Sequence, residues 1–278
     1  MIYQEITPSA ELLPYINCYW VIEDDDQSVL KDVSFPDGCV ELIFNMGVPV
    51  FRAPDHQNFS RNPSIELIGQ MSRSYAIQSQ GCRSMLGIRF YPHTVRSFFP
   101  IKISELTDRV INPNAISKIY DLLFQEIAET SDLNSQINAI ESFLLKQIRP
   151  EPYRRKLKIV DHAVKHILMR KDKSDLNMIL SQCDISARYL QKLFDEYVGI
   201  SPKLFMKIIR FQQSFKYLNE PRASLTSVAY QCGYFDQSHF IRDFKALSGK
   251  LPSQYTMEAH PYNEFFLKEA SRSYLFDY

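Results

Sequence analysis

The sequence predicts an α+β protein with a β-rich N-terminal part and an all-helical C-terminal part. Three observations support this prediction. Short segments rich in Val, Ile, Tyr, Trp and Phe follow one another through the first hundred residues. Helical spacing of apolar residues takes over from about residue 101. Residues 176–257 then contain one helix-turn-helix pattern twice, at an offset of 49 and later 50 residues.

The first hundred residues predict a small β domain. Its expected strands are Tyr15–Ile22, Cys39–Asn45, Ile65–Gly69, Tyr75–Gln78 and Arg83–Phe90. A turn at Pro36-Asp37-Gly38 separates the first two, and the polar stretch Asn58–Ser64 is expected to be a loop. Short strands at this spacing favour a small barrel or a sandwich, and we expect a cupin-like barrel.

Residues 101–150 are expected to be helical. A short piece at Ser104–Asp108 precedes one helix marked by Ile116, Ile119, Leu123 and Ile127. Asp132 is the expected N-cap of the next helix, whose apolar residues run to Leu144. Two interpretations are open for residues 116–148. These helices form a homodimer contact, or they pack on their own β domain.

The repeat places two similar helix pairs in the C-terminal part. Leu176, Ile179, Leu180 and Cys183 match Leu225, Val228, Ala229 and Cys232, and Leu190, Phe194, Gly199, Pro202 and Phe205 match Phe240, Phe244, Gly249, Pro252 and Tyr255. Ser186 and Asp236 stand where the second helix of each pair begins. A short polar side chain there can accept from the open N–H groups of the first turn, so both are predicted N-caps.

The outer face of each second helix carries side chains that read DNA bases. Arg and Lys pair with guanine, and Gln with adenine, in the major groove. The predicted DNA contacts are Ser186, Ala187, Arg188, Gln191 and Lys192 in the first copy, and Gln237, Ser238, His239, Arg242 and Lys245 in the second. A plain helical bundle with a solvated polar face is the alternative. Two copies with caps and a connecting helix favour the DNA reader.

The connecting helix is marked at both ends. Ser201 is the expected N-cap with Pro202 in the first turn, and Asn219 and Pro221 end the helix. About eighteen residues at 1.5 Å each give a rod of roughly 27 Å. Such a rod would hold two reading helices about one turn of DNA apart, roughly 34 Å.

Three stretches resemble the AraC/XylS family of bacterial transcription regulators. They are Ser186–Phe194 (SARYLQKLF), Ala229–Phe240 (AYQCGYFDQSHF) and Gly249–Tyr255 (GKLPSQY). The resemblance covers roughly residues 157–257. It implies a seven-helix DNA-binding domain, binding to double-stranded promoter or operator DNA, and control of transcription initiation, with RNA polymerase as a partner. Two positions depart from the family pattern: Leu180 replaces a small residue and Asp184 replaces a turn glycine. Asp enters the left-handed region more easily than most residues.

The N-terminal part also carries a resemblance. Phe35–Cys39 (FPDGC) and Gly87–Pro92 (GIRFYP) are similar to an N-terminal domain in one branch of the same family. We therefore expect a sensor or dimerisation domain at 1–150, a linker from Pro150 to Lys156, the DNA-binding domain at 157–257, and an aromatic tail at 258–278 that folds back on one domain.

Charge is distributed unevenly although the net charge is zero. Residues 151–257 hold 18 Lys and Arg against 10 Asp and Glu, whereas the rest of the chain holds 14 against 22. A basic unit attached to an acidic one suits a DNA-binding domain joined to a partner domain.

A sensor domain would hold a small-molecule effector. The candidate lining is Trp20, Asn45, Arg89 and Tyr91, although for any single one of these side chains an ordinary core or rim position is the favoured explanation. We expect no metal and no cofactor. Only His56 and His93 lie in this part of the chain, far apart in sequence, whereas a metal site needs clustered ligands.

Other function classes are disfavoured by the sequence. It has no run of eighteen apolar residues and no basic segment leading an apolar core at its start, so we expect a cytoplasmic protein without a membrane span. The cysteines Cys18, Cys39, Cys82, Cys183 and Cys232 suit buried free thiols. We expect no enzyme. A DNA-targeted enzyme such as an alkylation-repair protein would need a cysteine cluster, and an architectural DNA-binding protein without a ligand is the third alternative.

Overall fold

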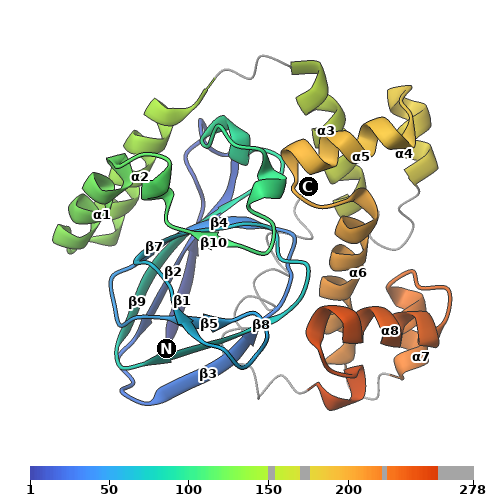
Figure 1. The fold of residues 1–278 in the computed structure, drawn as a ribbon, viewed down its shortest axis with the longest axis horizontal. Helices are drawn as coiled ribbons and strands as arrows, with labels where there is room; N and C mark the ends of the chain where they lie inside the picture. The colour runs from blue at the N-terminus through green and yellow to red at the C-terminus, as the bar shows by residue number, and fades with distance from the viewer. Residues whose placement is uncertain (150–153, 170–175, 221–223, 256–278) are drawn as a thin grey trace.

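The computed structural model describes residues 1–149, 154–169, 176–220 and 224–255, and its α+β class is as predicted (Figure 1). The β-rich part and two helices come first in the chain, and the remaining helices lie beside them on the other side of the sheets. The aromatic tail at 258–278 and most of the expected linker lie outside the described residues.

The strands form two antiparallel sheets. In spatial order, the first contains β1 (Ile2–Ile6), β2 (Ile16–Asp24), β9 (Arg83–Phe90), β4 (Val40–Asn45), β7 (Ile65–Ile68) and β10 (Val110–Ile111). The second contains β3 (Val29–Ser34), β8 (Tyr75–Gln80), β5 (Phe51–Ala53) and β6 (Ser60–Arg61). No strand described within residues 1–149 pairs from one sheet to the other, so the expected cupin-like barrel is not closed. Each sheet keeps its own edges, and the loop expected at residues 58–64 contains the short strand β6.

Two helices follow the sheets. A 3-10 turn at Pro113–Ala115 precedes α1 (Ile119–Glu129), which therefore begins later than the apolar pattern predicts. Helix α2 (Leu133–Gln147) begins with the predicted cap, because Asp132 accepts a hydrogen bond from the Ser135 backbone N–H at 2.8 Å. The inner faces of both helices are buried in one core with the first sheet. The structure thus shows that α1 and α2 pack on their own β domain, which is the second of the two interpretations.

The C-terminal part is helical. Its helices are α3 (Arg154–Met169), α4 (Leu176–Cys183), α5 (Ala187–Tyr197), α6 (Pro202–Leu218), α7 (Leu225–Gln231) and α8 (Gln237–Ser248). The pairs α4–α5 and α7–α8 are the two predicted helix-turn-helix units, and α6 connects them. In the first turn Asp184 takes a left-handed φ of 50°, while Gly233 takes 71° in the second. The predicted cap of α6 is confirmed, since Ser201 Oγ accepts from the Leu204 backbone N–H at 3.1 Å.

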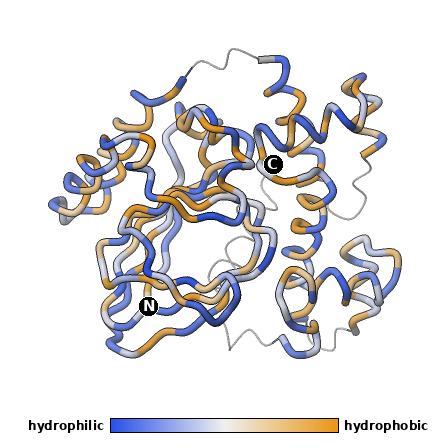
Figure 2. The backbone as a smooth tube through the Cα atoms, viewed as in Figure 1, coloured by the Kyte–Doolittle hydropathy of each residue, from blue (hydrophilic) through white to orange (hydrophobic). Residues whose placement is uncertain are grey.

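Buried apolar residues form a core in each part. Figure 2 shows hydrophobic residues alternating with hydrophilic ones along the strands and helices. The C-terminal core is not built from C-terminal residues alone, because Phe35 and Cys39 are buried within it. The expectation of buried thiols is correct for Cys18, Cys39 and Cys232, whereas Cys82 is exposed and Cys183 half-buried. Among the described helices, none is long and apolar enough to cross a membrane.

Candidate nucleic-acid interface and ligand pocket

Helix α5 turns a polar face to the surface. Ser186 caps it by accepting a hydrogen bond from the Tyr189 backbone N–H at 3.2 Å. Leu190, Leu193 and Phe194 are buried on the opposite face, which fixes the helix in the core. The five predicted DNA contacts of this unit are all exposed: Ser186, Ala187, Arg188, Gln191 and Lys192. Lys192 also lies beside a hollow that Arg96 and Lys102 of the N-terminal part help to line.

Helix α8 is the second helix of the second unit. Asp236 caps it by accepting from the His239 backbone N–H at 2.7 Å. Among its predicted contacts, Ser238, Arg242 and Lys245 are exposed, whereas Gln237 and His239 are half-buried.

Both half-buried side chains have partners within the chain. His239 Nε2 lies 3.5 Å from Asp243 Oδ2, and its ring stands edge-on to Tyr234 with centroids 5.2 Å apart. Gln237 accepts a hydrogen bond from Thr226 at 2.7 Å.

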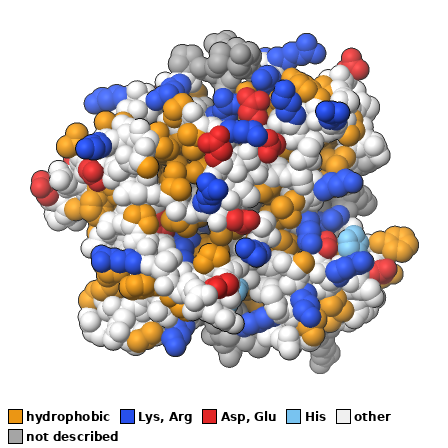
Figure 3. Space-filling model, viewed as in Figure 1, with side chains coloured by type: hydrophobic (Ala, Val, Ile, Leu, Met, Phe, Trp, Pro, Cys, Tyr) orange, Lys and Arg blue, Asp and Glu red, His pale blue; other side chains and the backbone are white. Residues whose placement is uncertain are grey.

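Exposed aromatic side chains flank this second unit, although neither is among the predicted DNA contacts. Phe235 is 86% exposed and Tyr230 is 65% exposed. Phe235 lies in the turn between α7 and α8, immediately before the N-cap residue Asp236. In Figure 3, Lys and Arg side chains lie along the edge of the molecule formed by the C-terminal helices, as the charge distribution predicts.

Two domain families match the chain. Residues 4–112 match a domain of unknown function, DUF6597. Residues 180–258 match a helix-turn-helix domain and include α5, α6, α7 and α8.

Two of the relatives are regulatory proteins. The Msm operon regulatory protein of Streptococcus mutans is 27% identical over 179 residues, which is 63% of this chain and 62% of that protein. The transcriptional activator RhaS of Escherichia coli is 27% identical over 74 residues, 27% of each chain. The matches therefore span less than two thirds of these relatives.

Residues 180–258 form an AraC-type helix-turn-helix domain. The resemblance to the AraC/XylS family is thereby confirmed. Solved structures with a similar arrangement include ToxT of Vibrio cholerae, 13% identical with a TM-score of 0.45 over 85% of this chain and 97% of that one. The DNA-binding domain of AdpA, solved in complex with a target DNA, is 18% identical with a TM-score of 0.30 over 42% of this chain and 97% of that one.

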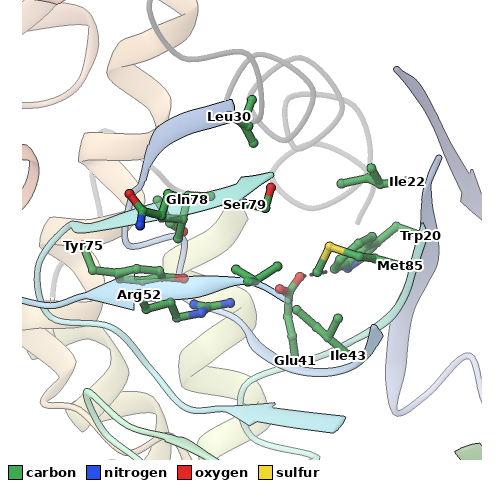
Figure 4. A pocket seen from close by; sticks show the side chains of 13 residues that line it. Trp20, Ile22, Leu30, Glu41, Ile43, Arg52, Tyr75, Gln78, Ser79 and Met85 are labelled. Carbon is green, nitrogen blue, oxygen red and sulfur yellow. Dashed lines mark hydrogen bonds between the residues drawn. The ribbon is translucent and has the colours of Figure 1, made fainter. Parts of the chain in front are cut away.

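A pocket opens between the two sheets of the N-terminal part (Figure 4). Its volume is about 60 Å³, enough for about four water molecules at 10–15 Å³ each. Apolar side chains form most of its wall: Trp20, Ile22, Leu30, Ile43, Val50, Ile77 and Met85. The polar groups are Ser34, Glu41, Arg52, Tyr75, Gln78 and Ser79. An apolar wall with a few polar groups is typical of small-molecule sites.

Arg52 is the unusual group in this pocket. Its side chain is buried, Nη2 pairs with Glu66 Oε2 at 3.0 Å, and its guanidinium carbon lies 4.7 Å from the centre of the Tyr75 ring. Nε and Nη1 have no hydrogen-bond partner among the described residues. Because buried donors normally have partners, these two atoms favour a bound ligand.

The pocket also holds a buried carboxylate. Glu41 accepts from Trp20 Nε1 at 3.1 Å and from Arg89 Nε at 3.0 Å. Burial nevertheless raises the pKa of Glu41, because desolvation outweighs the attraction of Arg89. Figure 4 shows Glu41 of β4 and Arg52 of β5 at the pocket, and these two strands belong to the two different sheets.

Of the four side chains predicted to hold an effector, Trp20 lines this pocket, whereas Asn45, Arg89 and Tyr91 lie elsewhere. Trp20 lines the pocket and packs against the backbone of Gly87, where a Cβ would lie 2.0 Å from the indole. Arg89 is buried behind Glu41, and Asn45 holds a turn by donating to the Val48 carbonyl at 3.0 Å. Tyr91 packs against the C-terminal core. Sequence spacing did not indicate that Arg52 and Tyr75 line a pocket. Arg52 lies on β5, a three-residue strand that was not predicted and that pairs with β8, which is distant in sequence.

The turn between β3 and β4 joins this pocket to the DNA-binding part. We define the Phe35–Cys39 loop as the residues between these strands that enter the C-terminal core. Its carbonyls are held from both sides, because Gln212 of α6 donates to Pro36 and Gln70 donates to Gly38 at 2.7 Å. Gly38 has a φ of 83°, and a Cβ there would lie 3.0 Å from the Phe205 ring. Only glycine therefore fits this contact without strain.

Further contacts tie the N-terminal part to both helix-turn-helix units. Arg96 pairs with Glu196, and Lys102 pairs with Asp195, both on α5. Near the end of α8, the Ser74 backbone N–H donates to the Leu247 carbonyl at 2.8 Å. The N-terminal part is thus placed to affect both units.

Proposed function

We propose that the chain is a sequence-specific DNA-binding transcription regulator with two reading helices, α5 and α8. The observation that carries this proposal is the pair of capped helices, each with an exposed polar face, joined by the 17-residue helix α6 within an AraC-type domain. At 1.5 Å per residue α6 is about 26 Å long, which suits two successive segments of the major groove.

The proposed base readers are polar side chains on the first two turns of each reading helix. Arg188 and Gln191 serve on α5, with Ser186, Ala187 and Lys192 beside them. Arg242 serves on α8 with Gln237, Ser238 and His239, and Lys245 binds a phosphate. The exposure of Arg188, Gln191 and Arg242 supports these roles. The N-cap geometry supports the docking of each helix through its N-terminal end.

The proposed domains are a sensor at 1–150 and the DNA-binding domain at 157–257. The sensor takes a small organic effector in the pocket between the sheets, held by the unpaired donors of Arg52. Ser34 and Glu41 line that pocket; Ser34 immediately precedes the Phe35–Cys39 loop, and Glu41 lies two residues after it. A ligand that shifts either strand end would therefore shift the loop against α6.

Two partners besides DNA belong to this proposal. RNA polymerase is the partner expected of a regulator of transcription initiation. A homodimer through α1 and α2 is supported by apolar side chains on their outer surface, where Leu122 is 66% exposed and Leu145 is 42% exposed.

Gel-shift titration of the full chain tests the function. A duplex from the promoter region of its own gene is compared with a scrambled duplex of the same length at one fixed salt concentration. We expect the native duplex to bind at least ~10³-fold more tightly. Equal binding to both duplexes would favour an architectural protein instead, and absence of binding would contradict the proposal.

A further inference from the structure

A side-chain hydrogen bond links the two helices of the second helix-turn-helix unit at the end that is proposed to face DNA. Thr226 is the second residue of α7, and Gln237 is the first residue of α8. The Thr226 hydroxyl donates to Gln237 Oε1 at 2.7 Å. The residues at the start of a reading helix are those that reach base edges, so this bond fixes a side chain at the centre of the proposed interface.

The bond changes what Gln237 can recognise. An unconstrained Gln reads adenine with both ends of its amide: the oxygen accepts from N6 and the nitrogen donates to N7. In this structure the Thr226 hydroxyl donates to one lone pair of the Gln237 amide oxygen and holds that oxygen toward α7, so the NH₂ group on the other arm of the amide is the freer end for a base. A guanine presents two acceptors, N7 and O6, and no donor from its purine ring in the major groove.

We propose that Thr226 is a positioning residue that holds Gln237 as a hydrogen-bond donor, so that Gln237 selects guanine over adenine at its operator position. This inference rests on the proposed function. Fixing the side chain before binding also reduces the rotamer freedom that Gln237 loses on the DNA.

The first helix-turn-helix unit lacks this arrangement. The repeat places Asn177 at the position of Thr226 and Ala187 at the position of Gln237. Ala187 has no side-chain amide to orient. The proposed selection therefore belongs to the half-site read by α8 alone.

The experiment measures base preference with the full chain. Wild-type protein is first used to select its preferred duplex from a randomised pool. Gln237→Ala then identifies the operator position at which preference is lost. Affinities for guanine and adenine at that position are compared for wild type, Thr226→Val and Thr226→Ser. Val keeps the shape of Thr without the hydroxyl, and Ser keeps the hydroxyl. Ser227→Ala on the same helix is the matched control.

We expect wild type and Thr226→Ser to prefer guanine. In Thr226→Val the ratio of guanine to adenine affinity should fall by roughly tenfold, since a good base contact discriminates by about that factor. Ser227→Ala should match wild type, and thermal unfolding should be alike for all variants.

Two results would overturn the inference: wild type prefers adenine at that position, or Thr226→Val keeps the wild-type ratio. Both leave sequence-specific binding intact. Failure of the wild type to select any duplex would instead count against the proposed function itself.

Discussion

Phe35 of the N-terminal part stacks on Phe215 of the DNA-binding part, with ring centroids 5.5 Å apart and planes at 23°. Phe35 also stands edge-on to Phe211 at 5.9 Å and lies 6.1 Å from the Tyr255 ring. An aromatic side chain from the N-terminal part thus completes the core around α6. The two parts of the chain are joined by packing as well as by surface ion pairs.

Replacing Phe35 should destabilise the DNA-binding part. Phe35→Ala leaves a cavity beside Phe211 and Phe215, which typically costs about 3–5 kcal/mol. Urea unfolding of the full chain, followed by circular dichroism, measures this loss. Phe59→Ala is the control, because Phe59 is 38% exposed and should change stability by less than ~1 kcal/mol. Equal effects of the two substitutions would show that the stacking does not stabilise the core.

The isolated fragment 157–257 should fold as a helical monomer and bind DNA, but less stably than the whole chain. Its own apolar faces form most of the core, yet Phe35 and Cys39 are missing from it. We expect a helical circular dichroism spectrum and a lower midpoint of thermal unfolding. A random-coil spectrum would contradict the first expectation, and an unchanged midpoint would contradict the second.

DNA binding should depend strongly on salt. Residues 151–257 carry a surplus of eight basic charges, and each neutralised phosphate contributes about −0.9 to the slope of log K against log salt. Titration of the full chain against its preferred duplex between about 50 and 200 mM salt measures that slope. A slope near zero would contradict binding through phosphates.

Arg242→Ala should relax sequence preference. Arg242 is exposed on α8, and a bidentate side chain discriminates its base by about 1–3 kcal/mol. Titration against specific and scrambled duplexes at one salt concentration gives the affinity ratio, which should fall by that amount. An unchanged ratio would mean that Arg242 contacts phosphate. Phe240→Ala is the folding control, because Phe240 is fully buried and its loss should cost about 3–5 kcal/mol of stability.

Acid should weaken the junction between the two parts. Asp161 of α3 lies 3.1 Å from His93 Nε2, and although burial opposes it, hydrogen bonds from His93 and Lys165 lower the pKa of Asp161. A carboxylate with a lowered folded pKa stabilises above its unfolded pKa of about 3.9, and this contribution is lost as pH falls below that value. Asp161→Asn should therefore reduce stability at pH 6 and have less effect near pH 3. Equal effects at both pH values, measured by urea unfolding, would contradict this.

Local sequence determined most of the DNA-binding part. Caps such as Ser186, Asp236 and Ser201 act on backbone groups within three residues, and helical spacing marks the buried faces, so α5, α6 and α8 could be predicted closely. The strands β2, β4, β7, β8 and β9 could be predicted because each contains a local run rich in Val, Ile and aromatic residues. Strands β1, β3, β5 and β10 were missed because their residues are polar or few, and their pairing depends on distant partners.

Tertiary structure alone decided how the parts meet and where the pocket lies. The sequence marks Pro36-Asp37-Gly38 as a turn, yet nothing local shows that Phe35 enters the core around α6. Arg52 lies opposite Trp20 only because two separate sheets face each other, and Gln237 meets Thr226 only because α7 and α8 cross at the turn. Local hydrogen bonds and periodicity are encoded within a few residues, whereas these contacts depend on the path of the whole chain.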